Sequence, residues 1–300
     1  MLQSPMPELP EVETVRRGLQ ERLPDEIVAS VEVRHPSILE DCEPGDLGDL
    51  SGFRFARVDR RAKYLLLRME SGEVAKTLVV HLGMTGQLTW KAVDQEVVDK
   101  FRRLVSGYRK STGAHSIDAH THLVVRTRSG GMLLFRDPRR FGRILLLDGS
   151  DENCPRIARL GPDAWRLDAR TMAGILRARS GRRCAKAVLL DQSVVAGIGN
   201  IYADEACFLA GIRPEKALAR LSAAKILRLA ESVDAVLEKG VVNAGTSFRD
   251  FVGSDGETGS NQEDLAVYGR GGLPCRVCGR ILATETVAQR TTVWCPKCQS

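Results

Sequence analysis

Four cysteines near the end of the chain place the strongest single constraint on its fold. Cys275 and Cys278 form one C-x2-C pair, Cys295 and Cys298 form a second, and sixteen residues separate the pairs. Two such pairs at this separation are typical of a zinc site, in which four thiolates surround one ion tetrahedrally. A closed shell of thiolates leaves no position for water, so we expect one structural Zn²⁺. A module this small cannot fold without its metal.

The segment between the two cysteine pairs predicts a β-hairpin. It reads ILATETVAQRTTVW, two β-rich runs with one acid, Glu285. The module as a whole is basic, with Arg276, Arg280, Arg290 and Lys297. A basic zinc hairpin suits a DNA contact, but zinc ribbons also bind proteins, and these residues alone leave both open.

The charge balance permits a polyanionic partner without proving one. The chain has 44 basic and 38 acidic residues, a net charge of +6, and an excess of this size is often only a matter of solubility. No apolar run reaches the length of a membrane span, and the first residues lack the pattern of a signal peptide. We therefore expect a cytoplasmic protein.

In the remainder of the chain, the predicted secondary structure changes from strands to helices at about residue 149. From residue 27 to 147, short β-rich runs alternate with turn signals such as Ser71-Gly72, which predicts a β-sandwich or barrel. Residues 92–118 interrupt this pattern with a polar, basic insertion that we interpret as a solvated loop in preference to a DNA contact. The region 149–245 is helical in pattern, with glycines as breaks.

The N-terminal stretch PELPEVETVRRGL reads as the start of a helix. Pro10 suits a first-turn position, and Glu8 and Glu11 favour the positive end of a helix dipole. Five residues, MLQSP, precede Met6. Their presence matters chemically, because a proline has a reactive amine only at a free terminus.

At this point the chain resembles bacterial formamidopyrimidine-DNA glycosylases, the enzymes that repair 8-oxoguanine. The resemblance covers nearly everything from Met6 to Gln299. It is carried, in order, by PELPEVETVRRGL, KYLLL, HLGMTG, RDPRRFG, LGPD, LLDQSVVAGIGNIYADEACFLAGI, VYGRGGLPCRVCG and QRTTVWCPKCQ. The run PELPEVE favours the purine branch over the endonuclease VIII group, which acts on oxidised pyrimidines.

The resemblance implies an α+β multidomain protein that binds DNA in a cleft. The expected parts are an N-terminal β-sandwich with an N-terminal helix (7–148), a helix-two-turn-helix domain (149–245), a lesion-capping loop (246–266) and a zinc finger with four cysteine ligands (267–300). The expected partner is double-stranded DNA with oxidised bases or abasic sites, bound by a monomer that is nucleoid-associated in a bacterial cytoplasm.

The resemblance also implies that the initiator methionine is removed and that Pro7 becomes the nucleophile. An α-amine has a pKa of roughly 8, so about a tenth of it is free base at neutral pH. Proline is a secondary amine, so attack on the sugar C1′ gives a permanently cationic iminium, which drives β- and then δ-elimination. Because residues 1–5 would block this amine, we expect Met6 to be the true start of the protein, so that its removal exposes Pro7.

Other roles are carried over residue by residue. Glu8 would be the general acid and base, Glu11 a support or only a cap, and Lys63, Lys186, Asn200 and Arg290 phosphate contacts. The glycines of GIGN would let the backbone approach that phosphate. Met84, Arg139 and Phe141 would fill the space left by the flipped nucleotide, with Arg139 facing the orphan cytosine.

Two departures from the family pattern stand out. In the capping loop, GSNQ replaces an aromatic that often precedes the glutamine, and the 92–118 insertion is additional. Two other classes remain as rivals, a DNA-binding zinc protein without catalysis and a zinc ribbon that binds proteins.

Overall fold

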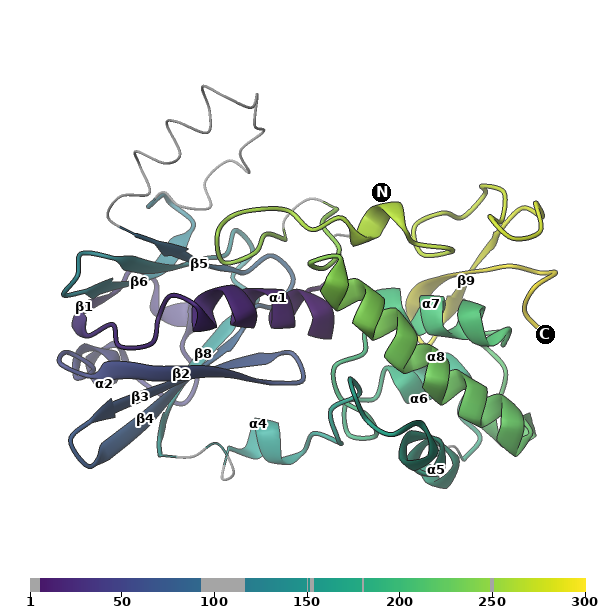
Figure 1. Cartoon of the computed structure of the whole chain (residues 1–300), viewed down its shortest axis with the longest axis horizontal. Helices are drawn as coiled ribbons and strands as arrows, with labels where there is room; N and C mark the ends of the chain where they lie inside the picture. Colours follow the sequence, from purple (N-terminus) through teal and green to yellow (C-terminus); the bar gives the residue numbers. More distant parts are fainter. Residues whose placement is uncertain (1–5, 93–116, 150, 152–153, 180, 249–250) are drawn as a thin grey trace.

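The chain folds into two lobes joined by a helix and by crossing loops (Figure 1). This computed structural model describes residues 6–92, 117–149, 151, 154–179, 181–248 and 251–300. Most of the expected insertion therefore lies outside the described residues. In the part of the chain that is described, no helix is both long and apolar enough to cross a bilayer.

The N-terminal lobe is a sandwich of two four-stranded antiparallel sheets, as the alternating runs predicted. One sheet has the order β1-β6-β7-β5, formed by Val28–Val33, Thr121–Thr127, Met132–Arg136 and Gln87–Lys91. The other has the order β2-β3-β4-β8, formed by Arg54–Arg61, Tyr64–Ser71, Val74–His81 and Arg143–Asp148. The inward side chains of both sheets form one apolar core with Phe55 and Phe135 at its centre. A short helix, α2 (Pro44–Gly48), and a 3₁₀ turn, η1 (Pro36–Ile38), cover one end.

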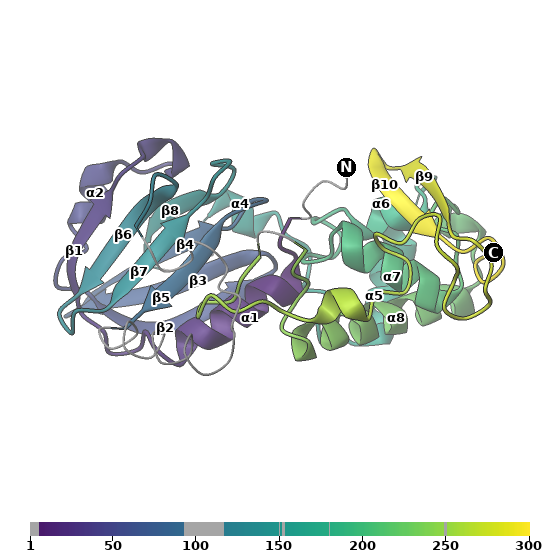
Figure 2. The ribbon, with the colours of Figure 1, turned by 90° about the horizontal axis from the view of Figure 1, so that it is seen from above.

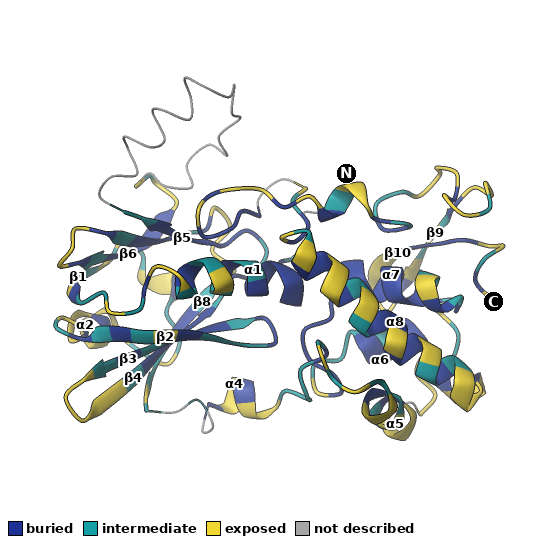
Figure 3. Ribbon diagram, in the orientation of Figure 1, coloured by how far each residue is buried: buried dark blue, intermediate teal, exposed yellow. Residues whose placement is uncertain are grey.

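Helix α1 (Leu9–Gln20) connects the two lobes. Val12, Val15 and Leu19 recur at helical spacing and enter the sandwich core. Leu9 instead belongs to the core of the helical lobe. The N-terminal end of α1 is thereby placed at the junction, where the helix is almost entirely buried (Figure 3).

The C-terminal lobe begins with helices. These are α5 (Ala169–Arg179), α6 (Ala185–Leu189), α7 (Asn200–Ala210), the 3₁₀ turn η2 (Leu218–Arg220) and α8 (Ala223–Val242). The short helix α4 (Pro155–Ala158) precedes them and packs instead on the sandwich, where Ile157 clusters with Leu66, Val79 and Leu145. Helices α5 and α7 pack on α8, and Tyr202 is the largest side chain in their core. The described pattern agrees with the expected helical domain.

The predicted hairpin forms from β9 (Ala283–Val287) and β10 (Arg290–Trp294) and lies beside α6 and α7 (Figure 2). Ala288 and Gln289 make its two-residue turn, both with positive φ. Before this module, the chain leaves α8 and crosses back to the sandwich. There Phe251 joins the sandwich core and the Ser254 carbonyl accepts a hydrogen bond from the Trp90 amide at 2.8 Å. It returns through the 3₁₀ turn η3 (Asn261–Glu263).

A nearly buried arginine reinforces the junction of the lobes. Arg60, at the end of β2, forms salt bridges with Glu13 of α1 at 3.1 Å and with Asp163 at 2.7 Å. Asp163 also accepts a hydrogen bond from the Ala62 amide at 2.9 Å. The β2–β3 turn, which carries Lys63, is therefore fixed relative to both α1 and the helical lobe.

Candidate active site

The carboxylate of Glu8 lies at the N-terminus of α7. It accepts hydrogen bonds from the backbone amides of Gly199 at 2.5 Å and Ile201 at 2.8 Å, with Tyr202 at 3.4 Å. A helix N-terminus presents unpaired amides and a positive dipole end, which suits a carboxylate. Burial nevertheless dominates and raises the pKa of Glu8 to about 7, against the lowering effect of Lys63 and of these amides. At neutral pH this group is therefore able both to give and to accept a proton.

Gly199 leaves the space that the Glu8 carboxylate occupies. A Cβ at this position would lie 2.4 Å from Cδ of Glu8 and 2.5 Å from its Oε1. Gly197, with φ of 109°, likewise packs against Leu9. We expected the glycines of GIGN to admit a phosphate, but the close approach that they allow in this structure is that of α1.

Lys63 approaches the same point from the β2–β3 turn. Its buried ammonium donates to the Ile198 carbonyl at 2.8 Å. That carbonyl and the Gly199 amide belong to one peptide unit, so Lys63 and Glu8 bind its opposite ends. Burial lowers the pKa of Lys63, while the nearby Glu8 and Glu11 raise it.

Glu11 is buried one turn behind Glu8 and braces it. One carboxylate oxygen accepts a hydrogen bond from the Glu8 amide at 2.8 Å. The other accepts hydrogen bonds from the Thr246 amide at 2.7 Å and from the Tyr202 hydroxyl at 2.8 Å. Burial raises the pKa of Glu11, and these donors oppose the rise. Glu11 thus has more partners than a helix cap requires.

Pro7 is buried and directly precedes Glu8, while Met6 is half-buried. The proline nitrogen is acylated by Met6 in the chain as written. The geometry around it, with a proton-exchanging carboxylate and an ammonium on one peptide unit, is the environment that an amine nucleophile needs.

Three further expected residues occupy two adjacent turns of the sandwich. Met84 lies in the turn after β4, and Arg139 and Phe141 lie in the turn between β7 and β8, where the guanidinium stacks 4.5 Å from the exposed phenyl ring. Buried Asp137 connects the two turns. It accepts a hydrogen bond from the Thr85 hydroxyl in the first turn and one from the Gly142 amide in the second, at 2.7 Å.

Arg290 and Asn200 lie where the hairpin meets α7. Arg290 is exposed at the end of the hairpin turn, and the Asn200 amide donates to the Thr291 carbonyl at 3.1 Å. Arg290 is close enough to Lys63 to lower its pKa. The finger thus brings an exposed guanidinium toward the Glu8 and Lys63 site.

Lys186 does not fit the expected phosphate contact. Its side chain is 0% exposed and forms a salt bridge of 2.6 Å with Asp204, which is also 0% exposed. It also donates to the Thr292 hydroxyl at 2.6 Å and approaches the Thr291 carbonyl at 3.2 Å. An ammonium with these partners fastens the finger to the helical lobe and presents no charge to DNA.

The four C-terminal cysteines fit one zinc ion. Their sulfur atoms all lie within 4.8 Å of one another, as a tetrahedron of thiolates around Zn²⁺ requires. Cys275 and Cys295 are buried, and Cys278 and Cys298 are half-buried. The ion has a structural role here, because it closes the module that carries Arg290.

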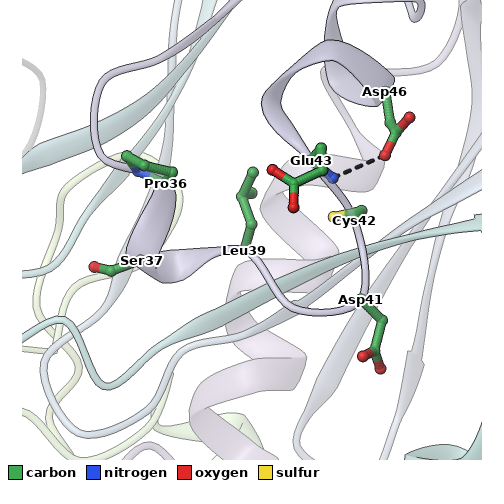
Figure 4. A pocket seen from close by; sticks show the side chains of 7 residues that line it. All are labelled: Pro36, Ser37, Leu39, Asp41, Cys42, Glu43 and Asp46. Atoms are coloured by element: carbon green, nitrogen blue, oxygen red, sulfur yellow. Dashed lines mark hydrogen bonds between the residues drawn. The ribbon is translucent and has the colours of Figure 1, made fainter.

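A shallow acidic pocket lies elsewhere, at the end of the sandwich covered by α2. Leu39, Cys42, Asp41, Glu43 and Asp46 are among the residues that line it (Figure 4). This end is opposite to the helical lobe (Figure 2). The pocket therefore takes no part in the site around Glu8.

Comparisons with known proteins match all three parts of the chain. Residues 6–144 match the formamidopyrimidine-DNA glycosylase N-terminal domain, residues 160–252 the H2TH domain of the same enzymes, and residues 272–300 the zinc finger found in FPG and IleRS. The formamidopyrimidine-DNA glycosylase of Desulfitobacterium hafniense is 40% identical over 98% of this chain and 100% of its own length. The chain belongs to the formamidopyrimidine-DNA glycosylase family. It is therefore a DNA glycosylase of base excision repair.

Solved structures of the family agree with the whole fold. A Lactococcus lactis FPG variant in complex with DNA containing Fapy-dG matches with a TM-score of 0.82, at 32% identity, over 98% of this chain and 100% of that chain. The wild-type Lactococcus lactis FPG in complex with DNA containing an oxidised pyrimidine matches with a TM-score of 0.81, at 32% identity and the same coverage. The β-sandwich, helical lobe and zinc finger expected from the sequence are thus confirmed as the family fold.

Sequence reasoning missed three residues that support the site. Gln192 binds the Gly197 amide at 2.9 Å and the Ile198 carbonyl at 2.8 Å, Tyr202 holds Glu11, and Asp137 holds the Met84 and Phe141 turns. Gln192 and Tyr202 lie in the long segment LLDQSVVAGIGNIYADE, and Asp137 in RDPRRFG. Their position inside segments that resemble the family was the only sequence signal that pointed to these residues.

Proposed function

We propose that this chain is a bifunctional DNA glycosylase and AP lyase that excises oxidised purines through the amine of Pro7. The observation that supports this most directly is the Ile198–Gly199 peptide unit, which binds the Glu8 carboxylate at one end and the Lys63 ammonium at the other. Both groups lie next to the residue whose amine the reaction needs.

In the proposed reaction the Pro7 nitrogen attacks C1′ of a flipped nucleotide. The bond from nitrogen to C1′ forms, the glycosidic bond breaks, and the base leaves with a proton. Glu8 gives a proton to the ring oxygen as the bond from C1′ to O4′ opens, which leaves a cationic iminium. A pKa of about 7 keeps much of Glu8 protonated at neutral pH for this step.

The iminium then draws electrons from the sugar. Loss of the C2′ proton releases the 3′ phosphate, a second elimination releases the 5′ side, and water hydrolyses the sugar remnant from Pro7. Glu8, ionised after the first step, would accept the C2′ proton. Lys63 stabilises the negative charge that develops around the sugar and its phosphate.

The proposed DNA contacts come from three places. Asn200 and Arg290 would bind backbone phosphates beside the lesion, and Met84, Arg139 and Phe141 would enter the stack, where the exposed ring of Phe141 is free to insert. Residues 246–266, which leave α8 beside Glu11, would cap the flipped base. The bound zinc supplies rigidity to the hairpin that carries Arg290.

Borohydride trapping tests the central role of Pro7. A chain that begins at Pro7 should become covalently joined to DNA containing 8-oxoguanine when borohydride reduces the iminium. A homogeneous chain that retains Met1, verified by intact mass, should give no adduct because its Pro7 nitrogen is an amide. Full excision by the Met1 chain would refute the assignment.

Oxidised pyrimidines are the second candidate substrate. The Lactococcus lactis enzyme of similar fold was crystallised with DNA containing one. Parallel single-turnover reactions on 8-oxoguanine and thymine-glycol duplexes separate the two, and we expect the purine lesion to react faster.

A further inference from the structure

Asn261, where the capping loop departs from the family pattern, is buried and fully engaged. Its side chain is 3% exposed. The amide nitrogen lies 2.8 Å from the Thr246 hydroxyl and 3.3 Å from the Tyr202 hydroxyl, and the amide oxygen accepts from Asn243 at 3.3 Å. An aromatic ring at this position would have no polar group to satisfy these partners.

The hydrogen bonds run in one direction, from Asn261 toward Glu11. The Tyr202 hydroxyl gives its proton to Glu11 at 2.8 Å, so its oxygen is left to accept from Asn261. The Thr246 amide donates to the same Glu11 oxygen. Only a donor at position 261 is compatible with this arrangement, because a carboxylate there would compete with Glu11 for the Tyr202 proton.

The chain of contacts continues to the proposed nucleophile. The second oxygen of Glu11 accepts the Glu8 amide at 2.8 Å. That amide belongs to the peptide unit that links Pro7 to Glu8. The orientation of Glu11 therefore fixes the backbone on which both proposed catalytic groups are carried.

We propose that Asn261 is a positioning residue for the Pro7–Glu8 segment, acting through Tyr202 and Glu11 from the base of the capping loop. The inference rests on the proposed function of Pro7. It connects the path of the capping loop to the alignment of Pro7. Displacement of Asn261 would therefore slow catalysis directly, in addition to uncovering the flipped nucleobase. The groups facing Glu11 are Glu8 at the start of α1, Lys63 from the β2–β3 turn and Tyr202 from α7.

A double-mutant cycle tests the relay, with single-turnover excision of 8-oxoguanine by chains that begin at Pro7. Asn261→Ala should slow excision about tenfold, the equivalent of one buried hydrogen bond, and Asn261→Asp should slow it further. Asn261→Ala placed in a Tyr202→Phe background should cost clearly less than it does alone, because the Tyr202 hydroxyl is already absent and only the hydrogen bond to Thr246 is still lost.

Asn243→Ala is the matched control. It removes the hydrogen bonds that Asn243 donates to the Asn261 amide oxygen and to Asp264, and neither of these leads to Glu11. We expect its excision rate to stay within about twofold of the wild type, as for a site outside the relay. Thermal melting of every variant identifies losses that come from unfolding, and Asn261→Ala avoids the buried charge that Asn261→Asp introduces.

Two outcomes would overturn the inference. The first is that the rate losses of the Asn261 and Tyr202 variants multiply independently in the double variant. The second is that Asn243→Ala slows excision as much as Asn261→Ala, which would mean that Asn261 only holds the loop in place. Borohydride trapping of the wild type runs alongside. If the wild type gives no adduct, the proposed function of Pro7 fails, whereas a trapped wild type without coupling defeats only the role of Asn261.

Discussion

Replacing Gly199 with alanine should damage catalysis while leaving the fold and DNA binding largely intact. The added Cβ would stand 2.4 Å from Cδ of Glu8, against a normal carbon–carbon contact of about 3.5 to 4.0 Å, so the carboxylate must retreat by about 1 Å. A retreat of that size breaks the hydrogen bonds to the amides of Gly199 and Ile201, which lie at 2.5 and 2.8 Å. Misplacement of a catalytic group by about 1 Å costs about a hundredfold in rate.

The measurement is single-turnover excision of 8-oxoguanine from a duplex, with equilibrium binding of the same DNA measured separately. Gly174→Ala is the control, since Gly174 lies in α5 with nothing within 4 Å of the added carbon. That substitution should leave excision unchanged and stabilise the protein by about 1 kcal/mol, the helix-propensity difference. Excision by Gly199→Ala within about threefold of the wild type would refute the assignment of Glu8 at this position.

Four further outcomes are expected. The pKa of Glu8, raised above the usual 4.5 to about 7, means that its contribution to stability is present below about pH 4.5 and lost as the pH rises through 7; Glu8→Gln should remove that slope from urea denaturation curves measured at pH 4 to 8. Phe141→Ala should slow excision from duplex DNA about tenfold, with no change in melting temperature because the ring is 47% exposed; equal losses on duplex and single-stranded substrates would contradict an intercalating role. Lys186→Met leaves buried Asp204 unpaired, so denaturation should show a loss of about 3 to 5 kcal/mol, whereas a reduced salt dependence of DNA affinity would restore its role as a phosphate contact. Removal of zinc by a chelator should abolish duplex cleavage and leave the far-ultraviolet signal of the sandwich, and retained cleavage would argue against the finger's role.

The elements themselves could be predicted because their signals are local. Strand alternation, the Pro10 helix start and the cysteine spacing each act over a few residues, and the structure contains the elements that they predict. The zinc hairpin is the clearest case, since one ion forces two short segments together. The family resemblance then predicted the order of the three domains and their packing into one DNA-binding protein.

The partners of charged groups could not be predicted in the same way. The local sequence RCAKAV does not distinguish an exposed lysine from Lys186, whose burial depends on Asp204 and on Thr292 in the finger. The same holds for Gly199, which the sequence predicts to approach a phosphate but against which the structure places Glu8, far away in the sequence. Such contacts are set by tertiary packing, which no short-range pattern encodes.

The peptide unit between Ile198 and Gly199 has a consequence for how the enzyme is assembled. Glu8 and Lys63 come from the first half of the chain, yet the backbone groups that orient them belong to the second. Neither half alone contains this arrangement, so Glu8 and Lys63 keep these backbone partners only while the lobes are docked. Under the proposed function, any movement that separates the lobes would stop the reaction without altering the Glu8 or Lys63 side chain.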